Sequence, residues 1–164
     1  MLQTSQALRA IGWAGLLAGS LDITAAFVEA HLEGRSPLSL LQGIAGGLLG
    51  MSSFRGDLAT AVLGAFFHFL IAFTAAALFY AASRKWTFLV KHSVPSGLLY
   101  GVMVYSFMNF VVLPLSAYHA TITLRPTIGL ARDIAIVMIM VGLPISLVVR
   151  KYSDSSFVKA SSLE

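Results

Sequence analysis

The sequence contains no cysteine among its 164 residues. This absence excludes disulfide bonds, thiolate nucleophiles and cysteine-ligated metal or iron–sulfur centres. Charged residues are also scarce, because they make up 11% of the chain, whereas soluble domains contain about 25%. Hydrophobic residues account for 57%, which is more apolar surface than a soluble core of this size can cover. The composition therefore indicates an integral membrane protein.

Four apolar stretches are long enough to cross a bilayer. A hydrocarbon core of about 30 Å requires about 20 apolar residues in a helix, and residues 58–83 lack Asp, Glu, Lys and Arg altogether. We predict an all-α fold, a polytopic membrane protein with four transmembrane helices in a bundle. Residues 1–152 form a single membrane domain, and residues 153–164 form a polar tail. The predicted spans are residues 8–32, 58–82, 95–117 and 126–150.

A shorter apolar segment, residues 36–50, follows the first span. Ser36 followed by Pro37 is typical of a helix start. The segment is too short to span, and apolar segments of about 10–14 residues are typical of re-entrant or interfacial helices. We predict such a helix on the side opposite the termini.

Basic residues cluster at the ends of the spans rather than along one face, which argues against nucleic acid binding. Seven Lys and Arg residues lie on the side of the termini and four on the other side. The positive-inside rule then predicts that both termini are cytoplasmic. The first group comprises Arg9, Arg84, Lys85, Lys91, Arg150, Lys151 and Lys159, and the second comprises Arg35, Arg55, Arg125 and Arg132.

Small residues recur on one face of the first span at alternating steps of three and four. Such a face lets another helix approach closely, which is how membrane helices associate. A packing seam explains the small residues but leaves the carboxyl group of Asp22 unexplained. Glycine-rich faces also suit a second copy of the chain or another membrane protein. The seam comprises Gly12, Gly15, Gly19, Asp22, Ala26 and Glu29.

Polar side chains gather in one half of the predicted bundle. Counting about 1.5 Å per residue along each helix places five of them between the midplane and the side opposite the termini. An ionisable group at such depth costs at least about 2.5–3.5 kcal/mol unless it pairs or meets water. We therefore predict a shared, outward-facing pocket. Its candidates are Asp22, His68, Asn109, Arg132 and Asp133, together with Tyr105, which shares a helix face with Asn109.

Arg132 and Asp133 are adjacent, and hence about 100° apart on a helix. We expect Arg132 to pair with Asp22, while Asp133 reaches His68 or a solvated mouth. Three simpler interpretations stay open. The charged groups could only fix helix register, His68 could bond to a backbone carbonyl, and Asn109 could join two helices.

No cofactor motif or metal site is predicted. The four histidines, His31, His68, His92 and His119, fall at different depths or on opposite sides of the bilayer. A haem would require two opposed histidines near the midplane, and only His68 qualifies. No complete catalytic set is present either, so we assign no catalytic residue.

Short motifs in the second half of the chain carry a family resemblance. They are Phe67-His68-Phe69, Ala82-Ser83-Arg84, Gly97-Leu98-Leu99-Tyr100-Gly101 and Leu113-Pro114-Leu115. With these motifs the chain resembles the YagU-like family of bacterial inner-membrane proteins, although its loop between the first two spans is shorter. The resemblance implies a multi-pass protein of the bacterial inner membrane. It implies no reaction, because that family has no established activity.

The leading functional hypothesis is a small membrane protein whose pocket binds or transports a solute, a proton or a lipid. Asp22 would be the protonatable group, and Arg132 its counter-ion or an anion contact. One alternative is a non-catalytic structural or accessory subunit that docks through glycine-rich faces. Another is an intramembrane enzyme with His68 and Asp133 as an acid–base pair, which lacks a nucleophile or metal. An open cavity would favour the first hypothesis, and a closed, fully paired core would favour the second.

Overall fold

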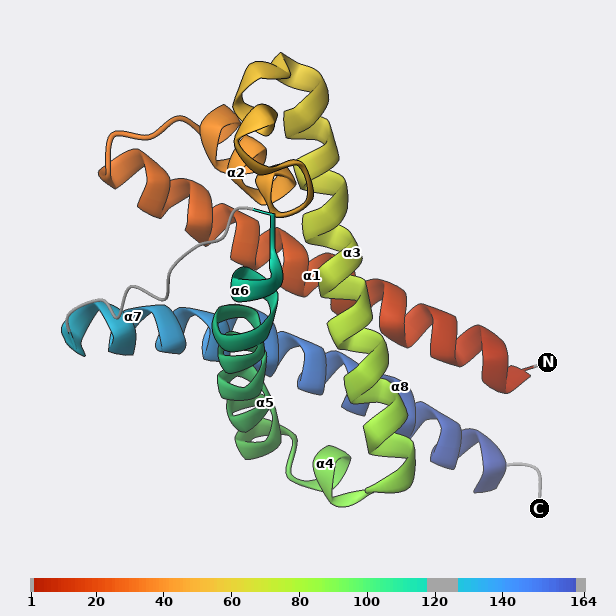
Figure 1. The fold of residues 1–164 in the computed structure, drawn as a ribbon. Coiled ribbons are helices and arrows are strands. Elements are labelled where there is room, and N and C mark those ends of the chain that lie inside the picture. The colour runs from red at the N-terminus through yellow and green to blue at the C-terminus, as the bar shows by residue number, and fades with distance from the viewer. Residues whose placement is uncertain (1, 118–126, 162–164) are drawn as a thin grey trace.

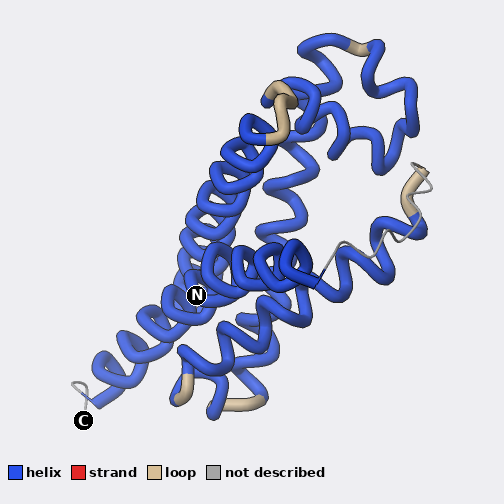
Figure 2. Tube along the Cα trace, turned by 90° about the vertical axis from the view of Figure 1, so that its left-hand side faces the viewer, coloured by secondary structure: helices blue, strands red, loops and turns tan. Residues whose placement is uncertain are grey.

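The computed structural model describes residues 2–117 and 127–161, which are almost entirely helical and contain no strand (Figures 1 and 2). Two short π-helical turns interrupt the spans, and we name them the first and second π turn. The elements in chain order are α1 (Leu2–Leu32), α2 (Pro37–Leu49), a 3₁₀ helix (Gly50–Arg55), α3 (Asp57–Lys85), α4 (Phe88–Lys91), α5 (Ser93–Phe107), the first π turn (Met108–Val112), α6 (Leu113–Leu115), α7 (Thr127–Val137), the second π turn (Met138–Gly142) and α8 (Leu143–Ser161).

The prediction of four spans in an all-α bundle is confirmed. Within the described residues, four helical stretches are long and apolar enough to cross a membrane: Ser5–Leu32, Asp57–Lys85, Ser93–Leu115 and Gly129–Ser153. The predicted start of the last span at Pro126 lies outside the described residues. Where the polar tail was predicted, α8 continues as a helix as far as Ser161.

Four spans in alternating directions give the bundle two ends. At the α2 end, α1 finishes and α3 and α7 begin. At the α4 end, α3 finishes and α5 begins. The N-terminus and the C-terminus emerge on the same side in Figure 1, as an even number of spans requires.

The predicted seam of α1 is confirmed at Gly15 and Gly19, which face α3, but not at Gly12, where an added Cβ atom would meet nothing within 4 Å. A Cβ atom on Gly15 would lie 2.9 Å from Cα of Phe73, and one on Gly19 would lie 2.9 Å from the ring of Phe69. Both positions are too close for a side chain. Glycine therefore sets the distance between α1 and α3.

A second glycine seam joins α5 to the span formed by α7 and α8. A Cβ atom on Gly101 would lie 2.5 Å from Cα of Met138, and one on Gly142 would lie 2.6 Å from the backbone nitrogen of Gly101. The glycines of both seams therefore pack against helices of the same chain.

The core lies toward the α4 end. Phe79, Ile145 and Val149 are its largest fully buried hydrophobic side chains. The Tyr100 hydroxyl donates to the Ala75 carbonyl at 2.7 Å, and its ring meets Phe79 edge-on with centroids 5.0 Å apart. These contacts tie α5 to α3 in this half of the bundle.

The predicted short helix forms as α2. The Ser36 hydroxyl caps it by accepting from the Ser39 backbone N–H at 3.1 Å, and its 13 residues span only about 20 Å. It packs against α3 at Gly64, where a Cβ atom would lie 2.7 Å from the carbonyl carbon of Leu41. Gln42 Nε2 donates to the Asp57 carbonyl at 3.0 Å, which fixes α2 to the start of α3.

The two π turns have the same relation to proline. Leu113 N–H donates to Met108 O and Leu143 N–H donates to Met138 O, and a proline follows each leucine directly. Proline lacks an N–H and its ring clashes with the carbonyl four residues earlier, so a widened turn relieves the clash. The span with Pro114 ends at Leu115, whereas the span with Pro144 continues as α8.

Candidate functional site: an intramembrane polar cavity

An open cavity of about 270 Å³ lies inside the bundle. Four polar residues line it: Asp22 from α1, His68 from α3, Tyr105 from α5 and Asn109 from the first π turn. Four of the six predicted pocket residues therefore come together in the structure. The rest of the lining is apolar or small and consists of Ala18, Gly19, Ile44, Ile71, Ala72, Ala75, Val104, Met108, Val137 and Val141.

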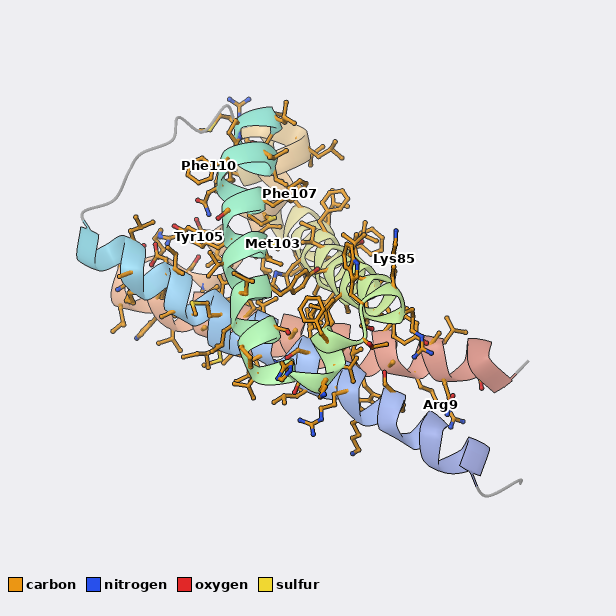
Figure 3. The ribbon with its side chains drawn as sticks, turned by 90° about the horizontal axis from the view of Figure 1, so that it is seen from below. Arg9, Lys85, Met103, Tyr105, Phe107 and Phe110 are labelled. Atoms are coloured by element: carbon orange, nitrogen blue, oxygen red, sulfur yellow. The ribbon has the colours of Figure 1, made fainter. Side chains whose placement is uncertain are left out.

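The cavity lies near the middle of the spans. Asp22 is ten residues before the end of α1, and His68 is eleven residues after the start of α3, which places both about 15 Å from the α2 end. Met103 and Phe107, labelled along α5 in Figure 3, are exposed on the bundle surface, whereas Tyr105 between them lines the cavity. The polar groups thus lie inside the bundle at bilayer depth.

Asp22 is half-buried in the cavity wall. Its carboxylate has no hydrogen bond to any residue that the structure describes, and it shares the cavity lining with His68. A carboxylate at this depth is costly unless it meets water, a proton or a cation. The open space beside it can supply one of these.

His68 is anchored by the glycine seam. Its Nε2 lies 2.8 Å from the Gly19 carbonyl oxygen, and a carbonyl only accepts, so Nε2 carries the hydrogen. The absence of a side chain on Gly19 brings the two helices close enough for this bond. The interpretation of His68 as bonded to a backbone carbonyl is confirmed, and the residue lines the cavity as well.

Asn109 bonds within its own helix rather than between helices. Its Nδ2 donates to the Tyr105 carbonyl at 2.9 Å, at the junction between α5 and the first π turn. The amide oxygen remains an acceptor at the cavity wall. Residues of both π turns, Asn109 and Val141 among them, line the cavity, and π turns occur frequently at functional sites.

The predicted ion pair between Asp22 and Arg132 is wrong. Arg132 Nη2 lies 2.9 Å from Glu29 Oε1 and 3.4 Å from Asp133 Oδ1. Arg132 follows closely on the start of α7, so its level is that of Glu29 near the end of α1. Glu29 belongs to the same face as Asp22 but lies about 10 Å nearer the α2 end. Glu29 was already a member of the seam predicted on the first span. A comparison of the depths of Asp22 and Glu29 with that of Arg132 would have selected Glu29 as the partner.

Arg132 and Asp133 do not line the cavity. The expected approach of Asp133 to His68 is also wrong for the described residues, because its carboxylate faces Arg132. The described residues therefore do not bring His68 and Asp133 together as the predicted acid–base pair. The described residues contain no group of three or more His, Asp or Glu that could hold a metal ion.

Sequence reasoning missed a second hollow, which we name the lateral groove. It encloses about 1050 Å³ between α2, α3 and the segment from the first π turn to α6. The sequence feature that could have indicated this groove is the pair Gly43 and Gly47 of α2, because residues without side chains leave open space along a helix. The groove is lined by Arg35, Ser39, Leu40, Gly43, Ile44, Gly47, Leu48, Phe54, Phe67, Leu70, Ile71, Met108, Val112, Leu113, Leu115 and Ser116.

The fold and the cavity define a four-span helical membrane protein with a polar chamber at bilayer depth. Comparison with protein-family models, with curated proteins and with solved structures gives no match. The YagU-like resemblance stays a prediction.

Proposed function

We propose that the protein binds a small solute with a cationic group in the polar cavity, as a membrane binding protein or carrier. The observation that carries this proposal is the open space itself. Asp22, His68 and Asn109 come from three spans and surround a cavity of about 270 Å³. A register-fixing network would bring such groups into contact with one another and leave no space between them.

The charge of the lining favours a cation over an anion. Asp22 is its acidic residue, and none of the described residues in the lining is an Arg or a Lys. The nearest candidate counter-ion in the sequence, Arg132, pairs with Glu29 instead. A cation in the cavity would therefore relieve the cost of the Asp22 carboxylate at this depth.

The other polar groups suit the same ligand. The amide oxygen of Asn109 accepts hydrogen bonds, and a neutral His68, whose Nε2 donates to Gly19, has Nδ1 as a second acceptor. An ammonium group carries several N–H donors, so acceptors beside a carboxylate match it. The Lys and Arg distribution favours a cavity opening on the non-cytoplasmic side, and the YagU-like resemblance favours a bacterial inner membrane as its location.

The lack of cysteine makes a labelling experiment clean, because a single introduced cysteine reports one position. Ala72 lines the cavity, and Ala76, one turn further along α3, is fully buried in the core. In lipid nanodiscs we expect Ala72→Cys to react about tenfold faster with a cationic thiol reagent than with an anionic one of equal size. Ala76→Cys, the matched control, should react with neither.

Two further measurements connect this reactivity to binding. Adding Asp22→Asn to Ala72→Cys should abolish the preference for the cationic reagent. Ethylammonium should slow the labelling of Ala72→Cys, because it occupies the same space. Equal rates with the two reagents, or labelling that ethylammonium leaves unchanged, would overturn the proposal.

A further inference from the structure

The cavity and the lateral groove adjoin each other, because Ile44, Ile71 and Met108 line both of them. The polarity changes from one to the other, because Asp22 and His68 line only the cavity, whereas the groove is mostly apolar along its length. A ligand that fills both parts must be polar at one end and apolar at the other.

The groove opens onto the outer surface of the bundle. Three of its lining residues, Leu48, Leu70 and Leu115, are 64%, 49% and 81% exposed, and exposed leucines on a membrane helix face hydrocarbon. The groove separates α3 from the first π turn and α6 toward the α2 end, whereas the Tyr100–Ala75 hydrogen bond joins α5 to α3 toward the α4 end. An apolar chain in the bilayer can therefore approach the cavity from this side of the bundle.

From this adjacency we propose that the ligand of the cavity is an amphiphile with an ammonium head and a long apolar chain, which passes between Ile44, Ile71 and Met108 and reaches the site from the bilayer. The head lies at Asp22 and the chain lies in the lateral groove. This inference rests on the proposed function and names its ligand class. Charge complementarity at Asp22 selects the head, and the apolar lining selects the chain.

Gly43 offers a way to fill the groove alone. It lines the groove, and a Cβ atom added there meets nothing within 4 Å, so Gly43→Leu places its side chain in open space. Gly12→Leu is the matched control, because Gly12 is equally open and lines neither hollow. The background is Ala72→Cys in nanodiscs, and the probes are ethylammonium and dodecylammonium.

The measured quantity is the concentration of dodecylammonium that halves the labelling rate of Ala72→Cys. We expect Gly43→Leu to raise this concentration by about tenfold. The same variant should leave protection by ethylammonium unchanged, and Gly12→Leu should alter neither value. Dodecanol, which has the same chain and no charge, should not protect. If Gly43→Leu does not fold, labelling of Gly43→Cys serves instead, and dodecylammonium but not ethylammonium should slow it.

The outcomes separate this inference from the proposed function. Protection by ethylammonium with no effect of Gly43→Leu on dodecylammonium would overturn the amphiphile and keep the cation site. Equal protection by dodecanol and dodecylammonium would also overturn it, because the head would then not be recognised. Failure of both ammonium probes would overturn the cation site and the amphiphile together.

Discussion

The two halves of this bundle are built from the same kinds of helices and differ in what fills the space between them. Toward the α4 end, Phe79, Ile145 and Val149 are fully buried, and Tyr100 bonds α5 to α3. Toward the α2 end, α2 lies against α3, and a polar cavity and an apolar groove remain open. One half provides rigidity, and the other provides space for a ligand.

The difference shows how a small membrane protein can hold polar groups at bilayer depth. Glycine seams and a packed core fix the spans, so a half-buried carboxylate such as Asp22 is tolerated elsewhere. Helix packing contributes the stability, and the unpaired polar group reduces it, which is the usual relation between stability and function at binding sites. This contrast predicts opposite effects of substitutions in the two halves.

The largest effect is expected where backbone meets backbone in the packed half. A Cβ atom on Gly142 would lie 2.6 Å from N and 2.8 Å from Cα of Gly101, and backbone cannot move aside as a flexible side chain can. Gly142→Ala should lower the free energy of unfolding by about 2 kcal/mol, measured by thermal unfolding in detergent. Gly43→Ala, in the open half, should leave it unchanged or raise it slightly, because Ala favours helix over Gly. Equal losses in the two variants would contradict the contrast between the halves.

A smaller effect of opposite sign is expected at Asp22. Its carboxylate has no hydrogen bond among the described residues, so Asp22→Asn removes a cost rather than a contact. The substitution should raise the free energy of unfolding by roughly 1 kcal/mol. Thermal unfolding of the same detergent preparation measures it. A large destabilisation by Asp22→Asn would show that the carboxylate has a structural partner.

The sequence predicted the spans because membrane spanning depends on length and apolar composition, which are local properties. The short helix at residues 37–49 was predictable for the same reason, since Ser36 and Pro37 specify its start. Glycine spacing also predicted the face of α1 that packs at Gly15 and Gly19. These features require no knowledge of which helix lies opposite.

The pairing of polar groups was less predictable, because it depends on relative depth and rotation of different helices. Asp22, His68 and Asn109 were placed together correctly from depth, but Arg132 was assigned to the wrong acid of the same face. Asp22 and Glu29 lie about two helical turns apart on α1, and each turn is about 5.4 Å. The predicted depth of the partner of Arg132 was wrong by this distance. The lateral groove was missed because its walls come from three segments far apart in the chain.

The smallest expected effect tests this corrected pairing. Arg132 and Glu29 lie at the edge of the open half, with side chains 52% and 29% exposed, so solvent screens their attraction. A double-mutant cycle with Glu29→Gln and Arg132→Gln should give a coupling free energy of about 0.5 kcal/mol, measured by thermal unfolding at low ionic strength. The coupling should shrink at high salt, because screening weakens exposed pairs.

A matched double-mutant cycle tests the pair of Asp22 and Arg132 in the same way. Because Asp22 lies about 10 Å deeper along the same face and Arg132 is held by Glu29, Asp22→Asn and Arg132→Gln should act additively. Additivity holds for separate sites and fails for residues in contact. A coupling with Asp22 larger than that with Glu29 would restore the deeper pair and place an arginine at the cavity. That result would reverse the inferred preference for a cation, because Asp22 would then already have its counter-ion.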